Sequence, residues 1–199
     1  MHRTSILLVA LSAALLAACG GSSSDDAGSQ KAAPAGIPAV FADYCTGTLL
    51  VDREGLRPSG AGSWEGQYIA ISAGSTFLLD YSLSRWNGGY VFDPQGAPTQ
   101  IDAAFTKGLV LGTDFSSDCV APGSVGAKNP LVILQRSTVY AAKDLSGSPC
   151  EIPAGTAFDG YGFSSVGDVA TFQASGLAGL CGFEQGYSKD LVFGKLVRK

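Results

Sequence analysis

Short hydrophobic runs recur along the chain from Ile37 onward, and each run ends within a few residues at Gly, Pro, Asn or Asp. Their length and turn-forming flanks are typical of β-strands and leave no room for a helix of about ten or more residues. Strands are expected at 48–51, 68–71, 76–83, 90–92, 108–111, 131–134, 138–141, 169–173 and 191–193, and one helical turn at 102–107. The pattern predicts an all-β fold, either a small barrel or a sandwich.

The clearest local motif is the Asn87-Gly88 pair, which lies between two of these runs. Asn-Gly readily adopts the positive φ angles that a two-residue hairpin turn requires. We therefore expect a tight turn at this pair, joining strand 76–83 to strand 90–92.

The first residues have the layout of a secretory signal peptide. The basic Arg3 is followed by an apolar stretch, 6–16, that is too short to span a bilayer. The sequence Leu-Ala-Ala-Cys ending at Cys19 resembles the lipobox of bacterial lipoproteins. The resemblance implies a signal peptide at 1–18 and a lipid on Cys19. Because Gly20 follows the cysteine in place of Asp, it also implies sorting to the outer membrane.

Residues 19–36 are expected to form the lipidated cysteine and a flexible linker. Gly, Ser, Ala and Asp dominate this segment, and such a composition buries too little apolar surface to offset its ordering entropy. Two or three acyl chains hold a protein at a membrane durably, since each buried methylene contributes about 0.8 kcal/mol. We expect a domain anchored to the outer membrane, and the side it faces, periplasm or exterior, stays open.

Composition narrows the function classes. Hydrophobic residues make up 46% of the 199 residues, which excludes disorder throughout. The 13 basic and 17 acidic residues give a formal net charge of −4, so the chain lacks the basic surface that a nucleic-acid partner requires.

The single histidine, His2, falls within the expected signal peptide. A mature chain without it has no Ser-His-Asp triad, no Cys-His pair and no imidazole ligand for a metal. Two carboxylates suffice for glycoside hydrolysis, but spacing singles out no pair among the acidic residues. Asp114 and Asp118 are expected in a solvated turn and not in a calcium loop, since the EF-hand pattern is missing. We therefore expect no catalytic residue, no cofactor and no metal site.

Four cysteines remain once Cys19 carries lipid. They are Cys45, Cys119, Cys150 and Cys181. An even number in an exported protein predicts two disulfides, and three connectivities are open. We favour Cys45 with Cys119 and Cys150 with Cys181, because each pair then brackets one half of the chain.

The two halves share a weak internal repeat. Ile71–Phe77, ISAGSTF, matches Ile152–Phe158, IPAGTAF, and each copy lies between extended runs. The second half also has a Gly-rich segment at 175–179 that is expected to form a hairpin turn. This order of strand, loop, Pro-Ala-Gly-Thr step and hairpin resembles bacterial SH3-like domains.

The resemblance implies two SH3-like halves, a β unit at 37–124 and a second at 131–199, joined near 122–130. Two family features are absent. The closing Gly-Trp-Val strand is replaced at Leu180-Cys181-Gly182, and the early Asn-Val-Arg motif is missing. Peptidoglycan binding, which some of those domains perform, is therefore an analogy here.

Aromatic residues near the expected hairpin turn are the candidate ligand contacts. A flat ring offers a face to a sugar or an apolar side chain, while Arg and Asn supply directed hydrogen bonds. The candidates are Trp86, Arg85, Asn87, Tyr90 and Trp64. The alternative for each ring is a place in the core. Strand alternation puts Trp86 on the face opposite Tyr81, which makes Trp86 alone the leading candidate.

Taken together, the sequence predicts a non-catalytic, disulfide-bonded outer-membrane lipoprotein that binds or organises envelope material. Peptidoglycan and envelope proteins are the expected partners besides the membrane. One alternative is an envelope glycan-acting enzyme with paired carboxylates, and another is a surface antigen or scaffold that binds only proteins. The basic C-terminus, Lys195, Arg198 and Lys199, is expected to be a frayed and solvated end.

Overall fold

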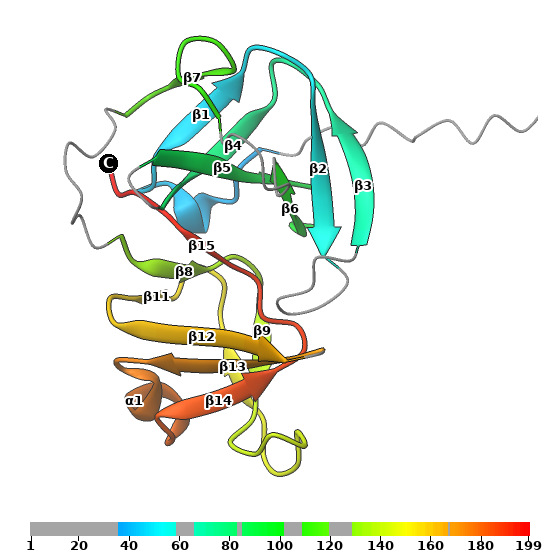
Figure 1. Cartoon of the computed structure of the whole chain (residues 1–199). Coiled ribbons are helices and arrows are strands. Elements are labelled where there is room, and N and C mark those ends of the chain that lie inside the picture. The colour runs from blue at the N-terminus through cyan, green and yellow to red at the C-terminus, as the bar shows by residue number, and fades with distance from the viewer. Residues whose placement is uncertain (1–35, 59–65, 83–84, 102–108, 120–128, 167) are drawn as a thin grey trace, which may run out of the picture.

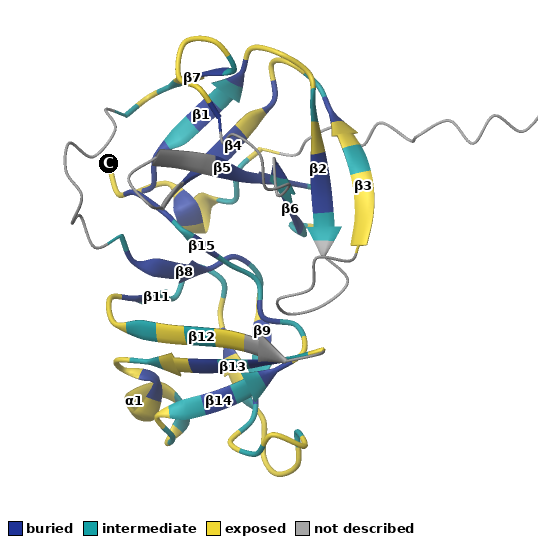
Figure 2. Cartoon of the chain, viewed as in Figure 1, coloured by how far each residue is buried: buried dark blue, intermediate teal, exposed yellow. Residues whose placement is uncertain are grey.

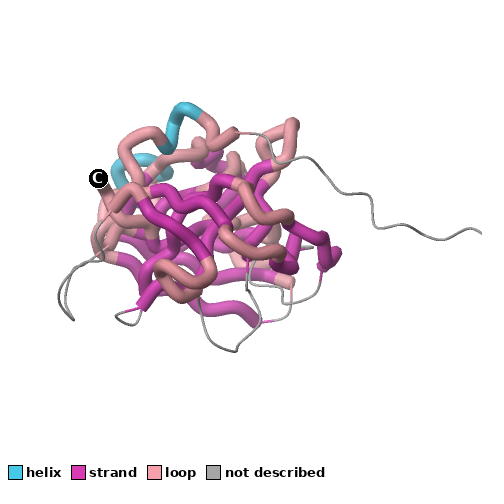
Figure 3. Tube along the Cα trace, turned by 90° about the horizontal axis from the view of Figure 1, so that it is seen from above, coloured by secondary structure: helices cyan, strands magenta, loops and turns pink. Residues whose placement is uncertain are grey.

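A computed structural model describes residues 36–58, 66–82, 85–101, 109–119, 129–166 and 168–199. Nearly all of its regular structure is antiparallel β-sheet, which confirms the all-β prediction. The helical parts of the described chain are one 3-10 turn, η1 (Ala39–Phe41), and one short helix, α1 (Leu177–Cys181), which are cyan in Figure 3. The strands form two units, the upper and lower halves of Figure 1.

Unit 1 is a seven-stranded antiparallel sheet with the order β3-β2-β6-β5-β4-β1-β7. Its strands are β1 (Thr46–Leu49), β2 (Arg53–Pro58), β3 (Gly66–Ile71), β4 (Thr76–Ser82), β5 (Arg85–Phe92), β6 (Pro98–Ile101) and β7 (Phe115–Ser117). A buried cluster that includes Leu49, Phe77 and Phe115 forms its core, and the rings of Phe77 and Phe115 meet edge to face at 5.7 Å.

Unit 2 contains the remaining strands. They are β8 (Leu131–Ile133), β9 (Ser137–Val139), β10 (Cys150–Ile152), β11 (Ala157–Phe158), β12 (Tyr161–Val166), β13 (Val169–Ala174), β14 (Gln185–Ser188) and β15 (Phe193–Lys195). They form sheets of order β10-β9, β11-β8-β15 and β12-β13-β14. A second buried cluster, with Phe158 and Phe172 edge to face at 5.2 Å, fills this unit.

The strand pairing of unit 2 repeats that of unit 1. Arg53 lies opposite Ile71 between β2 and β3, and Ser137 lies opposite Ile152 between β9 and β10. The corresponding registers link β1 with β8, β2 with β9, β3 with β10, β5 with β13, β6 with β14 and β7 with β15. The counterpart of β4 is divided into β11, which pairs with β8, and β12, which pairs with β13.

The repeated sequence forms the same turn in both units. Gly74 and Gly155 each have a φ of 85°, a backbone conformation that glycine adopts without strain. The Gly74 amide donates to the Leu49 carbonyl at 2.8 Å, and the Gly155 amide donates to the Ile133 carbonyl at 2.8 Å. The internal repeat seen in the sequence is therefore a repeat of backbone structure. The predicted boundaries at 124 and 131 stay predictions, because 120–128 lies outside the described residues.

The hairpin turn predicted at Asn87-Gly88 is wrong, because both residues lie within β5. Tyr81 pairs with Trp86 and Asp80 pairs with Gly88, so Asn87 is the extra residue of a β-bulge. Gly88, with a φ of 137°, supplies the backbone conformation that the irregularity needs. The two strands are instead connected through residues 83 and 84, which lie outside the described residues.

Two other local predictions also need correction. Residues 175–179 do not close a hairpin directly but lead into α1. The strand expected at 108–111 is reduced, in its described part, to one isolated bridge between Leu111 and Phe115. The helical turn expected at 102–107 lies outside the described residues.

A third buried cluster joins the two units. It contains Phe41, Tyr90 and Phe92 from the first half and Val132, Leu134 and Leu196 from the second. Figure 2 shows β8, which carries Val132, as buried along its length between the upper and lower sheets. The rings of Phe41 and Phe92 stack at 5.3 Å. The two units therefore share an apolar core and are packed against each other.

The C-terminus returns to unit 1 after β15 (Figure 1). The Cys45 amide donates to the Val197 carbonyl at 2.8 Å, and the Lys199 amide donates to the Asp43 carbonyl at 2.9 Å. The Lys199 ammonium lies 2.9 Å from an Asp118 carboxylate oxygen. The prediction of a frayed end is therefore wrong, since backbone pairing holds the last residues on the first unit.

Both favoured disulfide pairings are confirmed. Cys45 joins Cys119 within unit 1, and Cys150 joins Cys181 within unit 2. On the chain-entropy model their loops stabilise the fold by about 4.4 and about 3.7 kcal/mol, respectively. Disulfides of this kind persist in oxidising compartments, so they indicate a location outside the cytoplasm.

Candidate functional site

Tyr90, one of the predicted ligand contacts, is a core residue. The residue is 5% exposed, and its hydroxyl shares one proton between two acceptors, Asp80 Oδ2 at 3.2 Å and the Phe193 carbonyl at 3.0 Å. Burial, and after it the charge and hydrogen bond of Asp80, raises the pKa of Tyr90 well above its ordinary value. Tyr90 thus offers no ring to a ligand, because the strand places it between the two units.

The other predicted contacts stay predictions. Arg85, Trp86 and Asn87 have their backbone in β5, and their side chains are outside the described part of the chain. Trp64 and the proposed lipid-bearing Cys19 lie in undescribed segments. The structure therefore neither gathers these side chains into a site nor separates them.

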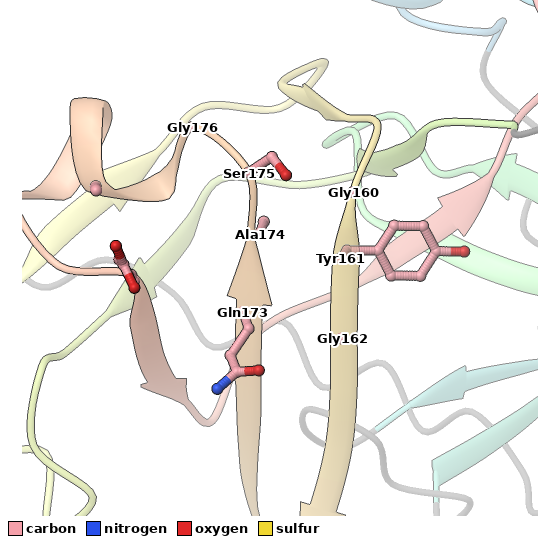
Figure 4. A pocket seen from close by; sticks show the side chains of 9 residues that line it. Gly160, Tyr161, Gly162, Gln173, Ala174, Ser175 and Gly176 are labelled. Carbon is pink, nitrogen blue, oxygen red and sulfur yellow. The ribbon is translucent and has the colours of Figure 1, made fainter.

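A groove on unit 2 is the candidate site. It lies between β12, β13 and the turn into α1, and has a volume of about 580 Å³ (Figure 4). Its lining is Gly160, Tyr161, Gly162, Gln173, Ala174, Ser175, Gly176, Ala178 and Glu184. Most of these residues are small, so few bulky side chains project into the groove.

Local sequence explains why the groove is open. Gly160 and Gly162 leave the β12 side of the groove without bulky side chains. The Ser175 amide donates to the Gly160 carbonyl at 2.6 Å, and a Cβ on Gly160 would lie 2.5 Å from Ser175 Oγ. A larger residue at position 160 would therefore have to displace the Ser175 hydroxyl. Gly176, with a φ of 93°, then turns the chain into α1.

A row of polar side chains continues the groove across the sheet. The Gln173 amide nitrogen donates to Gln185 Oε1, and the Gln185 amide nitrogen donates to the Tyr187 hydroxyl. Gln173 is exposed, so its carbonyl oxygen is available to a ligand. Figure 4 shows the ring of Tyr161 extending away from Gln173 and Ser175. On that side the Lys195 ammonium lies 5.4 Å from the ring centroid. The groove is consequently a hydrogen-bonding surface and not an aromatic platform.

Among the described residues, the internal repeat explains why this surface is free in unit 2 and covered in unit 1. Leu56 lies opposite Gln100 as Tyr140 lies opposite Tyr187, and in this shared register Gln173 and Gln185 correspond to Phe92 and Pro98 of unit 1. Phe92 is 1% exposed and belongs to the cluster between the units. The same face is therefore apolar and covered in unit 1, and polar and open in unit 2.

Acidic groups in the groove are few. Among its lining residues Glu184 is the one carboxylate. Other carboxylates hold the fold together: Asp93 pairs with Arg57 at 3.0 Å, and Asp190 accepts from the Thr138 amide at 3.0 Å. This arrangement provides hydrogen bonds to a ligand but not the two facing carboxylates that glycoside hydrolysis uses.

One group of potential metal ligands occurs among the described residues. It consists of Cys45, Asp118 and Cys119. Both cysteines are joined in a disulfide, so neither can supply the thiolate that binds a metal. Asp118 accepts from the Thr46 amide at 2.7 Å and hydroxyl at 2.9 Å, which makes it a structural residue.

No family model, curated protein or solved structure matches the chain. The resemblances to lipoproteins and to SH3-like repeats therefore stay predictions from the sequence. Within the described residues, no helix has the length and apolar character needed to cross a bilayer.

Sequence reasoning missed the groove residues. Gln173 in the groove and Gln185 beside it carry no motif, and exposed glutamines are common. The signal in the sequence was the internal repeat. Extending the match of Ile71–Phe77 with Ile152–Phe158 without a gap aligns apolar Phe92 with Gln173.

Proposed function

We propose that the protein is a non-catalytic binding module of the bacterial cell envelope, held at the outer membrane by lipid on Cys19. The groove on unit 2 is its ligand site. The observation that carries this proposal is the hydrogen-bonded row of Gln173, Gln185 and Tyr187 beside a groove lined mainly by small residues. The disulfides support exposure to an oxidising compartment, where envelope ligands are found.

The lining favours a polar, uncharged ligand. Amide side chains and peptide groups both donate and accept hydrogen bonds, which suits a hydroxyl- and acetamide-bearing chain. The described lining contains no cation to pair with an anionic ligand and few large apolar side chains to contact a hydrophobic one. A glycan strand of the cell wall meets these requirements, and peptidoglycan is the first candidate.

Binding is favoured over catalysis. Glu184 is the single carboxylate among the lining residues, so the described groove contains no second acid to pair with it. A lone exposed carboxylate provides a hydrogen-bond acceptor and not an acid–base pair. The glycan-acting enzyme is accordingly the weaker alternative.

The experiment is co-sedimentation of the oxidised chain from Gly20 to Lys199 with purified peptidoglycan. We expect retention that falls by roughly tenfold in Gln173→Ala, because the loss of a hydrogen bond from a ligand-filled groove costs about 1.4 kcal/mol. Gln67→Ala is the matched control, since Gln67 is an exposed glutamine on β3 of unit 1. Equal retention of wild type and Gln173→Ala, or none by either, would rule the groove out.

The Trp86→Ala variant separates the groove from the β4–β5 hairpin. If peptidoglycan retention depends on Trp86 and not on Gln173, the ligand site is the hairpin that the aromatic residues originally suggested. A product released from peptidoglycan, and abolished in Glu184→Gln, would instead show that the enzymatic alternative is right.

A further inference from the structure

The segment just before unit 1 packs against unit 2. Pro38, Val40 and Phe41 line a hollow of about 510 Å³ together with Leu134 and Ala154. The contact is close, because a Cβ on Gly155 would lie 2.3 Å from Val40 Cγ2. Leu134 is 1% exposed. The repeated turn of unit 2 and its neighbour Leu134 therefore form a cradle that is partly covered by an apolar segment, 37–41, in which Val40 itself is 52% exposed.

Unit 1 has the same cradle. The Leu50 amide donates to the Asp114 carbonyl at 2.8 Å, as the Leu134 amide donates to the Val192 carbonyl at 2.9 Å. Leu50 thus corresponds to Leu134, and by the shared turn Ala73 and Gly74 correspond to Ala154 and Gly155.

None of the described residues covers the cradle of unit 1. Leu50 is 47% exposed, and a Cβ placed on Gly74 would have nothing within 4 Å. Val51, the next residue, is 37% exposed. Two further apolar residues, Val110 at 52% and Leu111 at 48%, are exposed on the segment whose Val110 amide donates to Asp114 Oδ2 at 2.9 Å. An exposed pair of neighbouring apolar residues such as Leu50 and Val51 is a candidate interaction site.

We infer that the unit 1 cradle, formed by Leu50, Val51, Ala73 and Gly74, is a docking site for a short apolar segment of a partner protein. The occupant has the chemistry of 37–41, Ile-Pro-Ala-Val-Phe, in which Val40 packs over Gly155 and Phe41 shares a buried cluster with Leu134.

Charge adds a further requirement on the partner. Asp52 borders the unit 1 cradle, where unit 2 has Arg136, and its carboxylate is exposed while accepting from the Ala73 amide at 2.8 Å. An acidic border favours a segment that ends in Lys or Arg, and it disfavours an anionic lipid surface. It also disfavours the same segment of a second copy, in which Asp43 follows the apolar run.

The test uses the oxidised chain from Gly20 to Lys199 and the fluorescent peptide Gly-Ile-Pro-Ala-Val-Phe-Ala-Lys. Fluorescence anisotropy is expected to show saturable binding, weakened roughly tenfold by Leu50→Glu, since a buried carboxylate opposes the apolar contact. Leu180→Glu, at a residue with the same 47% exposure on α1, is the matched control and is expected to bind normally. Asp52→Lys should reverse the preference for the Lys-ended peptide over one ending in Asp.

Amide chemical shifts locate the contact. Peptide-induced shifts are expected at Leu50 and Gly74, whereas shifts at Leu134 and Gly155 would mean that the peptide merely displaces 37–41 from unit 2 and would overturn the inference. Absent or unsaturable binding, or equal losses in Leu50→Glu and Leu180→Glu, would overturn it too. Two other outcomes would also overturn the inference. If Leu50→Glu alone abolishes dimerisation, the occupant is a second copy of the chain. If it alone abolishes sedimentation with anionic vesicles, the occupant is the membrane.

Discussion

At the residue scale, Tyr90 connects three strands through one hydroxyl. Tyr90 lies on β5, and its hydroxyl shares its proton between the Asp80 carboxylate on β4 and the Phe193 carbonyl on β15. Asp80 in turn accepts from the Lys195 amide at 3.0 Å. A buried carboxylate needs such donors, because an unpaired charge in this position would cost several kcal/mol. Tyr90 is thus a joint between the two units.

The raised pKa of Tyr90 predicts a loss of stability in alkali. An unfolded tyrosine releases its proton near pH 10, whereas buried Tyr90 keeps its proton to higher pH. The unfolded chain then binds fewer protons than the native one, so the free energy of unfolding falls as pH rises above about 10. Tyr90→Phe removes this contribution.

We expect Tyr90→Phe to lower the free energy of unfolding by about 1–2 kcal/mol at neutral pH, because Asp80 loses a donor. The difference from wild type should narrow as pH rises above about 10. Urea unfolding at neutral and alkaline pH measures both, with the disulfides kept oxidised. A gap that stays constant with pH would show that Tyr90 does not titrate as its burial implies.

The same residue shows what sequence alone lacks. Tyr90 and Trp86 belong to one aromatic-rich stretch, and nothing in their spacing shows that Asp80 and Phe193 provide partners for the Tyr90 hydroxyl. The Phe193 contact spans 103 residues and exists only because the two units pack together. Predicting a buried polar contact requires the tertiary partner, whereas predicting a strand requires only its neighbours in the sequence.

At the element scale, the β4–β5 hairpin depends on a close backbone approach. A Cβ on Gly89 would lie 2.1 Å from the Leu78 carbonyl oxygen and 2.3 Å from Phe77 Cδ2. Gly89 therefore allows β5 to pack against the core ring of Phe77. Glycine here provides space, while Gly88 beside it provides a φ of 137°.

Gly89→Ala should destabilise the protein by about 1–3 kcal/mol or more, because the added methyl overpacks a buried site. Gly179→Ala is the control: this glycine lies in α1, an added Cβ would have open space, and alanine favours a helix by up to about 1 kcal/mol. The midpoints of thermal and urea unfolding should therefore fall in Gly89→Ala and rise in Gly179→Ala. Equal effects would show that the contact with Phe77 is relieved by small shifts of the strand.

Strand positions were predictable at this scale because hydrophobic runs and turn residues are local signals. The strand 76–83 predicted from its apolar run closely matches β4, and the repeated Ala-Gly step marks a turn in both units. The Asn87-Gly88 pair misled because positive φ serves a bulge as well as a turn. Local propensity does not distinguish the two, and the pairing of β4 with β5 decides between them.

At the scale of the whole molecule, the two-unit division follows from the repeat, but the way the units join does not. The shared cluster combines Phe41 and Phe92 with Val132 and Leu196, residues that no periodic pattern relates. Leu196 is fully buried, and the following Val197 carbonyl accepts from the Cys45 amide. The C-terminal segment therefore follows unit 2 in the sequence but pairs with unit 1, which ties the two halves into one structure.

This arrangement predicts that unfolding is a single transition and that Leu196 maintains it. Leu196→Ala should cost about 2–5 kcal/mol and divide the calorimetric transition in two, since it weakens the cluster between the units and leaves their own cores intact. Leu191→Ala is the matched control, because Leu191 is 2% exposed within the core of unit 2. It should lower the midpoint of a transition that stays single. If Leu196→Ala also unfolds in one transition, the units are coupled mainly through Tyr90 and Asp80, and Tyr90→Phe becomes the variant expected to separate them.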